Sequence, residues 1–503
     1  LKVPGVRQVE VSVNGGGSWL PAAVAPDGSW TFDWTPPSDG VYTVQARVTD
    51  DLMQGDATPG SDVIVGAGSL LPAENPILVV RDSGHTANPF GTYLAEILRG
   101  EGLVEFQEAE LASLMLDPDP LAYLNSFEVV ILAETLLETA EETLLRSFVS
   151  GGGVLIAMRP DPDLADLFGL TYVGARTEQL HQFFDFDTSS VPGAGIVDTS
   201  LQYHGVADEY ILSGAVSLGD LYDTETTPSA YPAVTLNDYG SGQAMAFTFD
   251  LAQSIVLVRQ GNPAWAGIDG DGLGGYRPLD LYASGGDTWL ANSKLRIPQA
   301  DEKQRFLANL ILSVSGKPLP RMWYLPGDEK TVIVTTGDSD GASPAQCEQE
   351  QDDIAGYGGV MTNYMIQGTL SATDAVTEAA WRAAGHETSI HPEISSNTWA
   401  EGMSVYTAMV GQFQTQFGHS PRTVRNHTLD WIGWTEMPEV QELHGVRMDA
   451  NNYHYATWLA DRTSGYMTGS GLPQRFVDEN GQLIDVYQVL TEWADEWFVG
   501  QGY

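Results

Sequence analysis

Hydrophobic and polar residues alternate along the first 65 residues of the chain. Val9–Val13, Trp30–Trp34 and Val41–Val48 carry apolar side chains at every second position, and glycine- or proline-rich turns separate them. This period of two predicts short β-strands, and short strands with regular turns are typical of a β-sandwich. We therefore predict a β-sandwich over residues 1–68, with no group of residues that supports catalysis.

A different pattern begins near residue 72. Short apolar runs alternate with segments of helical period, and Gln299–Val314 has the pattern of a closing helix. The apolar runs are Pro76–Val80, Phe127–Leu132 and Val154–Met158. Strands that alternate with helices predict a parallel, doubly wound α/β sheet over residues 72–320, with β-rich insertions at about 171–282.

The alternation of strands and helices starts again in residues 321–503. The predicted strands are Thr331–Thr336, Val360–Ile366, Glu387–His391, Thr423–His427 and Val446–Asp449. Repeated strand–helix units predict a (β/α) barrel, whose chemistry lies at the C-terminal ends of its strands. These strands are fewer than such a barrel needs, so we expect it to be incomplete or abbreviated.

Length and charge narrow the possible partners. A chain of 503 residues is long enough for about three domains. Its 67 acidic and 23 basic residues give a net charge of −44, which argues against binding nucleic acid or anionic membranes. There is no apolar run of the roughly 18 residues that a membrane span requires, and no signal sequence at the N-terminus. We expect a secreted or cell-surface protein whose signal sequence has been removed.

Several residues with catalytic or metal-binding side chains fall at predicted strand ends of the last unit. Asp338 and Asp340 end the first strand, His391 ends the third, and Arg425 and His427 end the fourth. Two carboxylates and two imidazoles at one rim are the ligands that a zinc-type divalent ion prefers, with one position left open for water. The alternative is that these are unrelated polar loop residues.

These segments also resemble a known family. TVIVTTGDSDG, GHETSIHPE and RNHT are similar to successive motifs of the polysaccharide deacetylases, the nodulation-factor-type carbohydrate esterases of family four. The resemblance implies that Asp340, His391 and His427 hold a divalent metal, with zinc expected, and that Asp338 is the catalytic base. It assigns Arg425 to holding Asp338 or steadying negative charge. The implied activity removes acetyl groups from a polysaccharide or cell-surface glycan.

Two tryptophans lie shortly after the fourth strand. Trp431 and Trp434 are candidates for a sugar-facing platform, because aromatic rings stack on pyranose rings; packing against neighbouring loops is the alternative.

The chain departs from the family pattern at three points. Ser339 stands where the family has the second Asp of its pair, and Ser395 stands where it has the second metal histidine. No histidine follows His454, so the family's late general acid has no counterpart. The alternative function is therefore a non-catalytic extracellular protein, either a surface or filament protein or a carbohydrate-binding protein, that uses a degenerate deacetylase barrel as a scaffold.

The first two units resemble other families. VSVNGGGSW and the strands after it are similar to bacterial immunoglobulin-like domains, and residues 72–320 are similar to the class I glutamine-amidotransferase-like, flavodoxin-type fold. That fold's enzymes carry a cysteine on the turn after a strand, whereas Cys347, the single cysteine, lies outside this unit. We therefore predict a structural role for residues 72–320. Self-association could occur through this unit or through the immunoglobulin-like one. Asp269 and Asp271 form either a calcium loop or a plain acidic turn.

A second interpretation of the first strand end concerns Ser339. Gly337–Gly341 has the form G-x-S-x-G after a strand, as in a nucleophile elbow. This pattern makes Ser339 a candidate nucleophile of a serine esterase. The flanking carboxylates argue against it, since they oppose both an alkoxide and an oxyanion.

Overall fold

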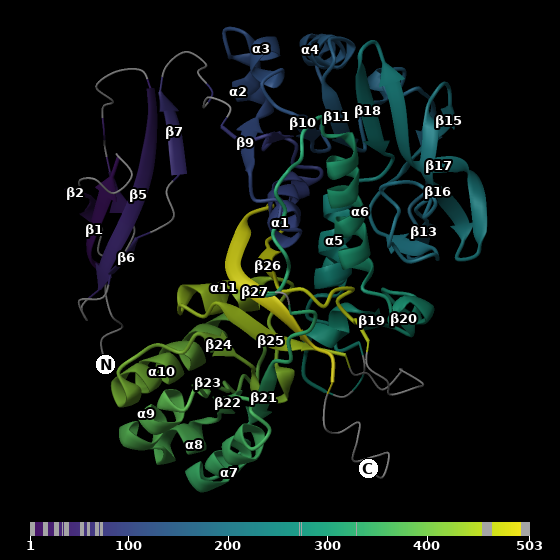
Figure 1. Cartoon of the computed structure of the whole chain (residues 1–503). Helices are drawn as coiled ribbons and strands as arrows, with labels where there is room; N and C mark the ends of the chain where they lie inside the picture. Colours follow the sequence, from purple (N-terminus) through teal and green to yellow (C-terminus); the bar gives the residue numbers. More distant parts are fainter. Residues whose placement is uncertain are drawn as a thin grey trace.

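The computed structural model contains three successive units (Figure 1). It describes residues 6–13, 19–24, 30–32, 34, 40–50, 55–57, 61–65, 70, 74–270, 272, 274–327, 329–454 and 465–493. Among these residues, none of the helices is both long and apolar enough to span a membrane.

The first unit consists of antiparallel strands, as the alternating pattern predicts. Its strands are β1 (Val6–Ser12), β2 (Leu20–Pro21), β3 (Ala23–Val24), β4 (Trp30–Thr31), β5 (Gly40–Asp50), β6 (Gly55–Ala57) and β7 (Ser61–Val65). Five of them form a sheet around the long β5, and β3 pairs with β4 separately. The immunoglobulin-like assignment stays a prediction.

The central unit is built on a nine-stranded sheet. Its order is β14-β13-β16-β17-β18-β11-β10-β8-β9, and the five strands from β18 to β9 are parallel. These parallel strands are β8 (Ile77–Arg81), β9 (Phe106–Glu110), β10 (Val129–Leu132), β11 (Val154–Met158) and β18 (Gly242–Phe247). The predicted doubly wound parallel sheet is therefore present.

Helices cover both faces of this sheet. Along β8, Ile77 and Val79 belong to one hydrophobic core and Leu78 and Val80 to the other, because neighbouring side chains of a strand point to opposite faces. The helices of the first face are α1 (Tyr93–Gly100), α5 (Leu251–Gln260) and α6 (Gln299–Val314), and those of the second are α2 (Leu111–Met115), α3 (Pro120–Leu124) and α4 (Thr139–Ser150).

The predicted β-rich insertions extend this sheet on one side. The antiparallel strands β13 (Gln182–Phe184), β14 (Leu201–Tyr203), β16 (Val216–Thr224) and β17 (Thr227–Tyr239) join it, while β12 (Leu170–Ala175) and β15 (Asp208–Leu212) form a separate pair. A short pair, β19 (Ala283–Ser284) and β20 (Asp287–Thr288), follows α5.

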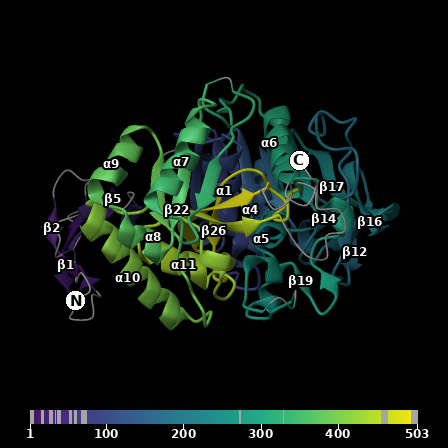
Figure 2. The ribbon, with the colours of Figure 1, turned by 90° about the horizontal axis from the view of Figure 1, so that it is seen from below.

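The C-terminal unit has a seven-stranded sheet of order β21-β22-β23-β24-β25-β27-β26. Its strands are β21 (Thr335–Asp338), β22 (Met361–Met365), β23 (Glu387–Ile390), β24 (Thr423–Val424), β25 (Met448–Tyr453), β26 (Gln474–Val477) and β27 (Leu483–Thr491). The helices are α7 (Pro344–Ala355), α8 (Gln367–Ala372), α9 (Ala375–Ala383), α10 (Trp399–Phe417) and α11 (Glu436–Leu443). Helices α7 to α10 pack against β22 and β23, on the side away from the central sheet (Figure 2).

This sheet is not a closed barrel in the described residues, which corrects the barrel prediction. Five neighbouring pairs are parallel, but β26 runs antiparallel and does not pair with β21. The free edge of β26 is covered by the central unit instead. Glu96 accepts a hydrogen bond from the Arg475 backbone N–H, and the Gln260 amide makes two hydrogen bonds with the Val477 backbone. These side chains occupy the backbone groups that would pair with a further strand.

The first strand is also shorter than predicted. Thr331–Thr336 was expected, but β21 begins at Thr335, which pairs with Met361 at the start of β22. Residues before Thr335 have no partner on β22, because β22 itself begins only at Met361, shortly after the turn at residues 356–358.

The central and C-terminal units share one hydrophobic core. Its buried side chains form a single cluster in space, with members from Ile77 in the central unit to Val486 in the C-terminal unit. At their junction, Arg475 donates two side-chain hydrogen bonds to the buried carboxylate of Glu96, at 2.7 and 3.0 Å. The C-terminal strands therefore lie in a fixed position relative to the central unit.

Candidate functional site

The candidate site lies where β21, β23 and β24 end. Asp338 is the last residue of β21, His391 directly follows β23, and Arg425 directly follows β24. Because these strands are parallel, their C-terminal ends meet at one edge of the sheet. The structure brings together the five charged or imidazole residues that the sequence analysis placed at strand ends.

Arg425 is the most connected residue of the site. Its Nη1 donates to Asp338 Oδ1 at 3.1 Å, and its Nε donates to the Ala450 carbonyl at 3.2 Å. Its Nη2 donates to the hydroxyls of Thr336 (2.8 Å) and Thr491 (3.0 Å). The guanidinium also lies over the Tyr364 ring, 5.2 Å from its centroid.

These contacts show that the open sheet is strongly curled. Thr336 is on β21 and Thr491 is on β27, which are separated by four strands in the sheet order. Both hydroxyls nevertheless contact one nitrogen atom of Arg425. The guanidinium therefore occupies the inside of a curved sheet and joins the strands that hydrogen-bonded pairing leaves apart.

Asp340 lies in a strained turn just after β21. It has φ of +37°, in the left-handed region that costs most residues about 1–2 kcal/mol, and Gly341 follows at +88°. Its side chain is 62% exposed, and Oδ1 lies 3.2 Å from His391 Nε2. The turn thus directs the carboxylate from the end of β21 towards the end of β23.

The protonation of the His391 ring follows from its hydrogen bond. His391 is buried, and its Nδ1 lies 2.7 Å from the Arg425 carbonyl. A carbonyl can only accept, so Nδ1 carries the proton, and in a neutral ring Nε2 then has a lone pair. That lone pair faces a carboxylate oxygen of Asp340. The arrangement is repulsive unless a second proton or a cation lies between the two atoms.

His427 completes the predicted ligand set at a longer distance. Its Nε2 lies 3.9 Å from Asp340 Oδ1, and its Nδ1 lies 3.8 Å from Glu393 Oε1. The rings of His391 and His427 are 5.5 Å apart and nearly perpendicular. Two ligands of a tetrahedral zinc ion are about 3.3 Å apart, given bonds of about 2.0 Å.

These distances decide how well the residues fit a metal ion. Asp340 and His391 have the spacing of two zinc ligands, whereas His427 has to move inward. No group of three or more His, Cys, Asp or Glu side chains in the described part of the chain is arranged to hold a metal as it stands. The oxygen and nitrogen donors are nevertheless those that zinc accepts.

The loop after β24 is held by the central unit. Thr428 and Leu429 both have positive φ, and Arg277 Nε donates to the Thr428 carbonyl at 3.0 Å. Trp431 N donates to the Tyr276 carbonyl. Strained backbone next to His427 therefore persists because a loop of the other unit fixes it.

A buried polar network fixes the end of β24 from behind. Asn426 donates its backbone N–H to Asn451 Oδ1 at 2.6 Å, and its own side-chain oxygen accepts from Tyr406. Asn451 in turn donates its backbone N–H to Asp449 Oδ1, and Gln441 donates to Asp449 Oδ2. Burial raises the pKa of the Asp449 carboxyl to about 6. Arg425 and His427, on either side of Asn426, are thus held by a fully buried acid.

The two serines of the sequence analysis are used structurally. Ser339 is 4% exposed, and its hydroxyl accepts from the Ile366 backbone N–H at 2.9 Å, within the junction of β21 and β22. A nucleophile elbow requires an exposed hydroxyl, so this position opposes the serine-esterase reading. Ser395 is exposed and donates its backbone N–H to Glu401 at the start of α10.

The predicted sugar platform is wrong. Trp431 and Trp434 are 1% and 6% exposed. Trp434 donates its Nε1–H to the Gln260 carbonyl and packs edge-on against Phe90. Both tryptophans are buried where the C-terminal unit meets the central unit, so the packing alternative holds.

Asp269 belongs to a tight turn. Its two carboxylate oxygens accept from the backbone N–H groups of Gly272 and Gly274. These contacts favour the plain acidic turn over a calcium loop. Asp271 lies outside the described residues.

Sequence reasoning missed three residues that contact this site. Glu393 lies two positions after His391, within the same motif, so its acidic side chain was a visible signal. Thr336 and Thr491 carried no signal, because only the curl of the sheet brings their hydroxyls to Arg425.

Comparisons with known proteins return distant similarities. No family model matches the chain, and no curated protein matches it. Among solved structures, Agd3, described as a novel carbohydrate deacetylase, aligns with 82% of this chain and 70% of its own at 11% identity and a TM-score of 0.34.

Two further structures align with about a third of the chain. A beta-galactosidase from Rahnella sp. R3 aligns with 35% of this chain and 29% of its own, at 18% identity and a TM-score of 0.28. The cytoplasmic protein STM3548 from Salmonella typhimurium aligns with 35% of this chain and 88% of its own, at 13% identity and a TM-score of 0.28. The chain thus spans less than a third of the beta-galactosidase, and alignments at these values assign no activity.

Proposed function

We propose that the C-terminal unit is a metal-dependent hydrolase that removes acetyl groups from a glycan. Asp340, His391 and His427 are the residues that would hold the metal, with zinc expected from the mixed oxygen and nitrogen donors. When bound, such a divalent ion supplies Lewis-acid chemistry and acidifies water. Asp338 and Arg425 are the remaining members of the site.

The observation that carries the proposal is the contact between His391 and Asp340. The Nδ1 proton is committed to the Arg425 carbonyl, so the lone pair of Nε2 faces a carboxylate oxygen at 3.2 Å. Metal-binding histidines commonly have this pattern, with one ring nitrogen donating to a backbone carbonyl and the other facing the ion. A cation between the two atoms removes their repulsion.

The same geometry supports Asp338 as the proton acceptor. Asp338 Oδ1 accepts from Arg425, and the carboxylate is partly open to solvent. Its second oxygen, Oδ2, is available to accept a proton from an attacking water, which is the role of a general base. Arg425 fixes the carboxylate through its four hydrogen-bond partners and is a positioning residue.

The test combines metal content with acetate release. The full chain, incubated with zinc and dialysed, is measured by elemental analysis and then assayed for acetate release from acetylated chitooligosaccharides and acetylated xylan. We expect about one metal per chain and released acetate. His391→Gln should lose both, because an amide does not replace the imidazole ligand.

A matched variant separates the rival functions. Ser339→Ala is expected to keep both metal and activity, since this hydroxyl only accepts a backbone hydrogen bond. Activity lost in Ser339→Ala, with metal retained, would favour the serine esterase. A folded wild-type chain that takes up no metal and releases no acetate would instead be the scaffold protein.

A further inference from the structure

A chain of hydrogen bonds connects His391 to a buried acid on β25. His391 Nδ1 lies 2.7 Å from the carbonyl oxygen of Arg425. The same peptide group donates its N–H, which belongs to Asn426, to Asn451 Oδ1 at 2.6 Å. Asn451 Nδ2 in turn donates to Asp449 Oδ2 at 2.5 Å. The imidazole is therefore linked to a carboxylate through one peptide group and one side-chain amide.

Every link of this hydrogen-bond chain has only one possible direction. The Arg425 carbonyl can only accept, so His391 Nδ1 donates to it, and the backbone N–H of Asn426 can only donate. Asn451 therefore turns its oxygen towards Asn426 and its NH2 group towards Asp449, whose ionised carboxylate can only accept. All the bonds thus point from the imidazole towards the acid, with donors and acceptors arranged head to tail.

The sequence of β25 places the two side chains of this hydrogen-bond chain together. Residues two apart in a strand share a face, as Asp449 and Asn451 do. Asp449 pairs with Val424, the last residue of β24, so Asn451 lies beside the backbone that follows β24. The Asn451 backbone N–H also donates to Asp449 Oδ1 at 3.0 Å, and Gln441 from α11 donates to Oδ2 at 2.6 Å. These contacts fix the carboxylate and, through it, the orientation of the Asn451 amide.

Asp449 is a charge buried among neutral hydrogen-bond donors. It is fully buried, and it accepts from one backbone N–H and two side-chain amides. Burial raises the pKa of this carboxyl to about 6, so it is ionised at pH 8. Buried hydrogen bonds that are aligned head to tail polarise one another, and an anion at the acceptor end strengthens every acceptor along the way. The Arg425 carbonyl is therefore a stronger acceptor for the His391 N–H than an isolated peptide group.

We infer that Asp449 and Asn451 are positioning residues for His391. Acting through the peptide group after Arg425, they hold the proton on Nδ1 and increase the electron density at Nε2, which faces Asp340. In metal sites, a carboxylate or carbonyl behind a histidine ligand sets its tautomer and strengthens it as a ligand. The effect on zinc binding rests on the proposed function, whereas the effect on the imidazole does not.

The first measurement uses the full chain after removal of metal by a chelator, so it does not depend on activity. The chain is labelled with 15N in histidine and studied by NMR at pH 8, with the His391 signals assigned by their loss in His391→Gln. We expect a protonated Nδ1, an unprotonated Nε2 and an Nδ1 proton at low field, because its hydrogen bond is strengthened by the acid. Asp449→Asn removes the charge at nearly constant shape and should move this proton signal upfield.

The second measurement is zinc affinity, determined by competition with a chelator. Loss of a partner behind a ligating histidine typically costs about 10–100-fold in metal affinity, and we expect about tenfold in Asp449→Asn because the acid acts through two intervening groups. The double variant Asp449→Asn/Asn451→Asp moves the carboxylate one link closer to the peptide group. It should restore both the low-field proton and the zinc affinity, which a defect in packing would not do.

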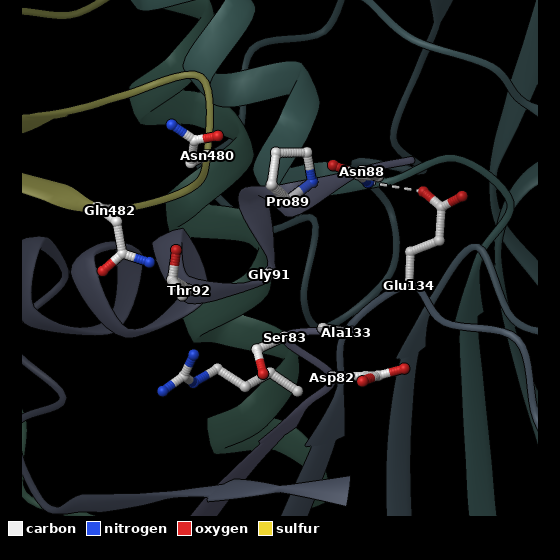
Figure 3. A pocket seen from close by; sticks show the side chains of 11 residues that line it. Asp82, Ser83, Asn88, Pro89, Gly91, Thr92, Ala133, Glu134, Asn480 and Gln482 are labelled. Atoms are coloured by element: carbon white, nitrogen blue, oxygen red, sulfur yellow. Dashed lines mark hydrogen bonds between the residues drawn. The ribbon is translucent and has the colours of Figure 1, made fainter. Parts of the chain in front are cut away.

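A matched control comes from the central unit. Asp82 lines a small pocket where β8 and β10 end (Figure 3). It too accepts from neutral donors, the Gly84 N–H and the Thr135 hydroxyl. Asp82→Asn makes the same chemical change outside the candidate site and should leave the His391 proton and the zinc affinity unchanged. An equal loss of zinc affinity in Asp82→Asn and Asp449→Asn would show a general effect of charge on a chain of net charge −44 and would overturn the inference.

Two other outcomes would also overturn it. One is a His391 proton signal that is the same in wild type and Asp449→Asn, because the charge is then not transmitted to the ring. The other is a zinc affinity that falls in Asp449→Asn and stays low in the double variant. A proton signal that responds as expected in a chain that binds no zinc and releases no acetate would retain the positioning role and reject the proposed hydrolase.

Discussion

Ionisation of the buried Asp449 is expected to make the protein less stable as the pH rises. Burial raises the pKa of this carboxyl from 3.8 to about 6 in the folded chain, and in the unfolded chain it titrates normally. Folding therefore takes up a proton between these two values. The stabilisation is fully present below about pH 4 and is lost as the pH rises through about 6.

The magnitude follows from the size of the change. One pKa unit is worth about 1.4 kcal/mol, so the complete effect is about 3 kcal/mol, of which about 1.5 kcal/mol falls between pH 5 and pH 8. Asp449→Asn removes the titration while keeping the shape of the side chain. From pH 5 to pH 8, the unfolding free energy of the wild type should therefore fall by about 1.5 kcal/mol relative to that of the variant.

The assay is urea unfolding followed by tryptophan fluorescence at both pH values. The difference between wild type and variant at one pH cancels the titration of all other groups. The change of that difference between pH 5 and pH 8 also cancels any pH-independent loss of hydrogen bonding by the amide. The central and C-terminal units share one core, so we expect them to unfold in one transition. A wild-type-to-variant difference that is the same at pH 5 and pH 8 would refute a buried, ionising Asp449.

Three further substitutions test the assignments. Trp434→Ala should lower the unfolding free energy by about 3–5 kcal/mol in urea unfolding, because this side chain is buried. An unchanged unfolding free energy would show that the side chain is exposed. Glu393→Gln should weaken zinc binding about tenfold in a chelator competition, if the carboxylate orients His427, with folding unaffected. Arg425→Lys should retain zinc but lower acetate release at least a hundredfold, because an ammonium cannot reach Asp338, Thr336 and Thr491 together; full activity would contradict the positioning role.

Local sequence patterns predicted most elements of the two α/β units. The closing helix Gln299–Val314 has the predicted bounds, and β10 and β11 fall where apolar runs indicated them. These elements have strong periodicity and are stabilised by their own apolar faces. The hairpin of β26 and β27 was not predicted, although Ile484, Val486 and Gln488 are buried at alternate positions.

The site was predictable where it depends on strand ends and not where it depends on tertiary packing. Asp338, Asp340, His391, Arg425 and His427 come together because parallel strands end at one edge, which the alternation alone implies. The tryptophans were misplaced because their surroundings come from the central unit, through Phe90 and Gln260. No pattern within residues 321–503 contains that information.

The open sheet and the position of Arg425 have a common cause. Glu96 and Gln260 occupy the free edge of β26, so that edge is not available to β21. The sheet can then curl without closing through backbone pairing, and its two sides need another connection. Arg425 supplies it, because one nitrogen contacts β21 and β27 while the other holds Asp338. The residue that orders the proposed base is therefore also the residue that holds the curled sheet together, so its loss is expected to impair both the geometry of the site and the stability of the unit.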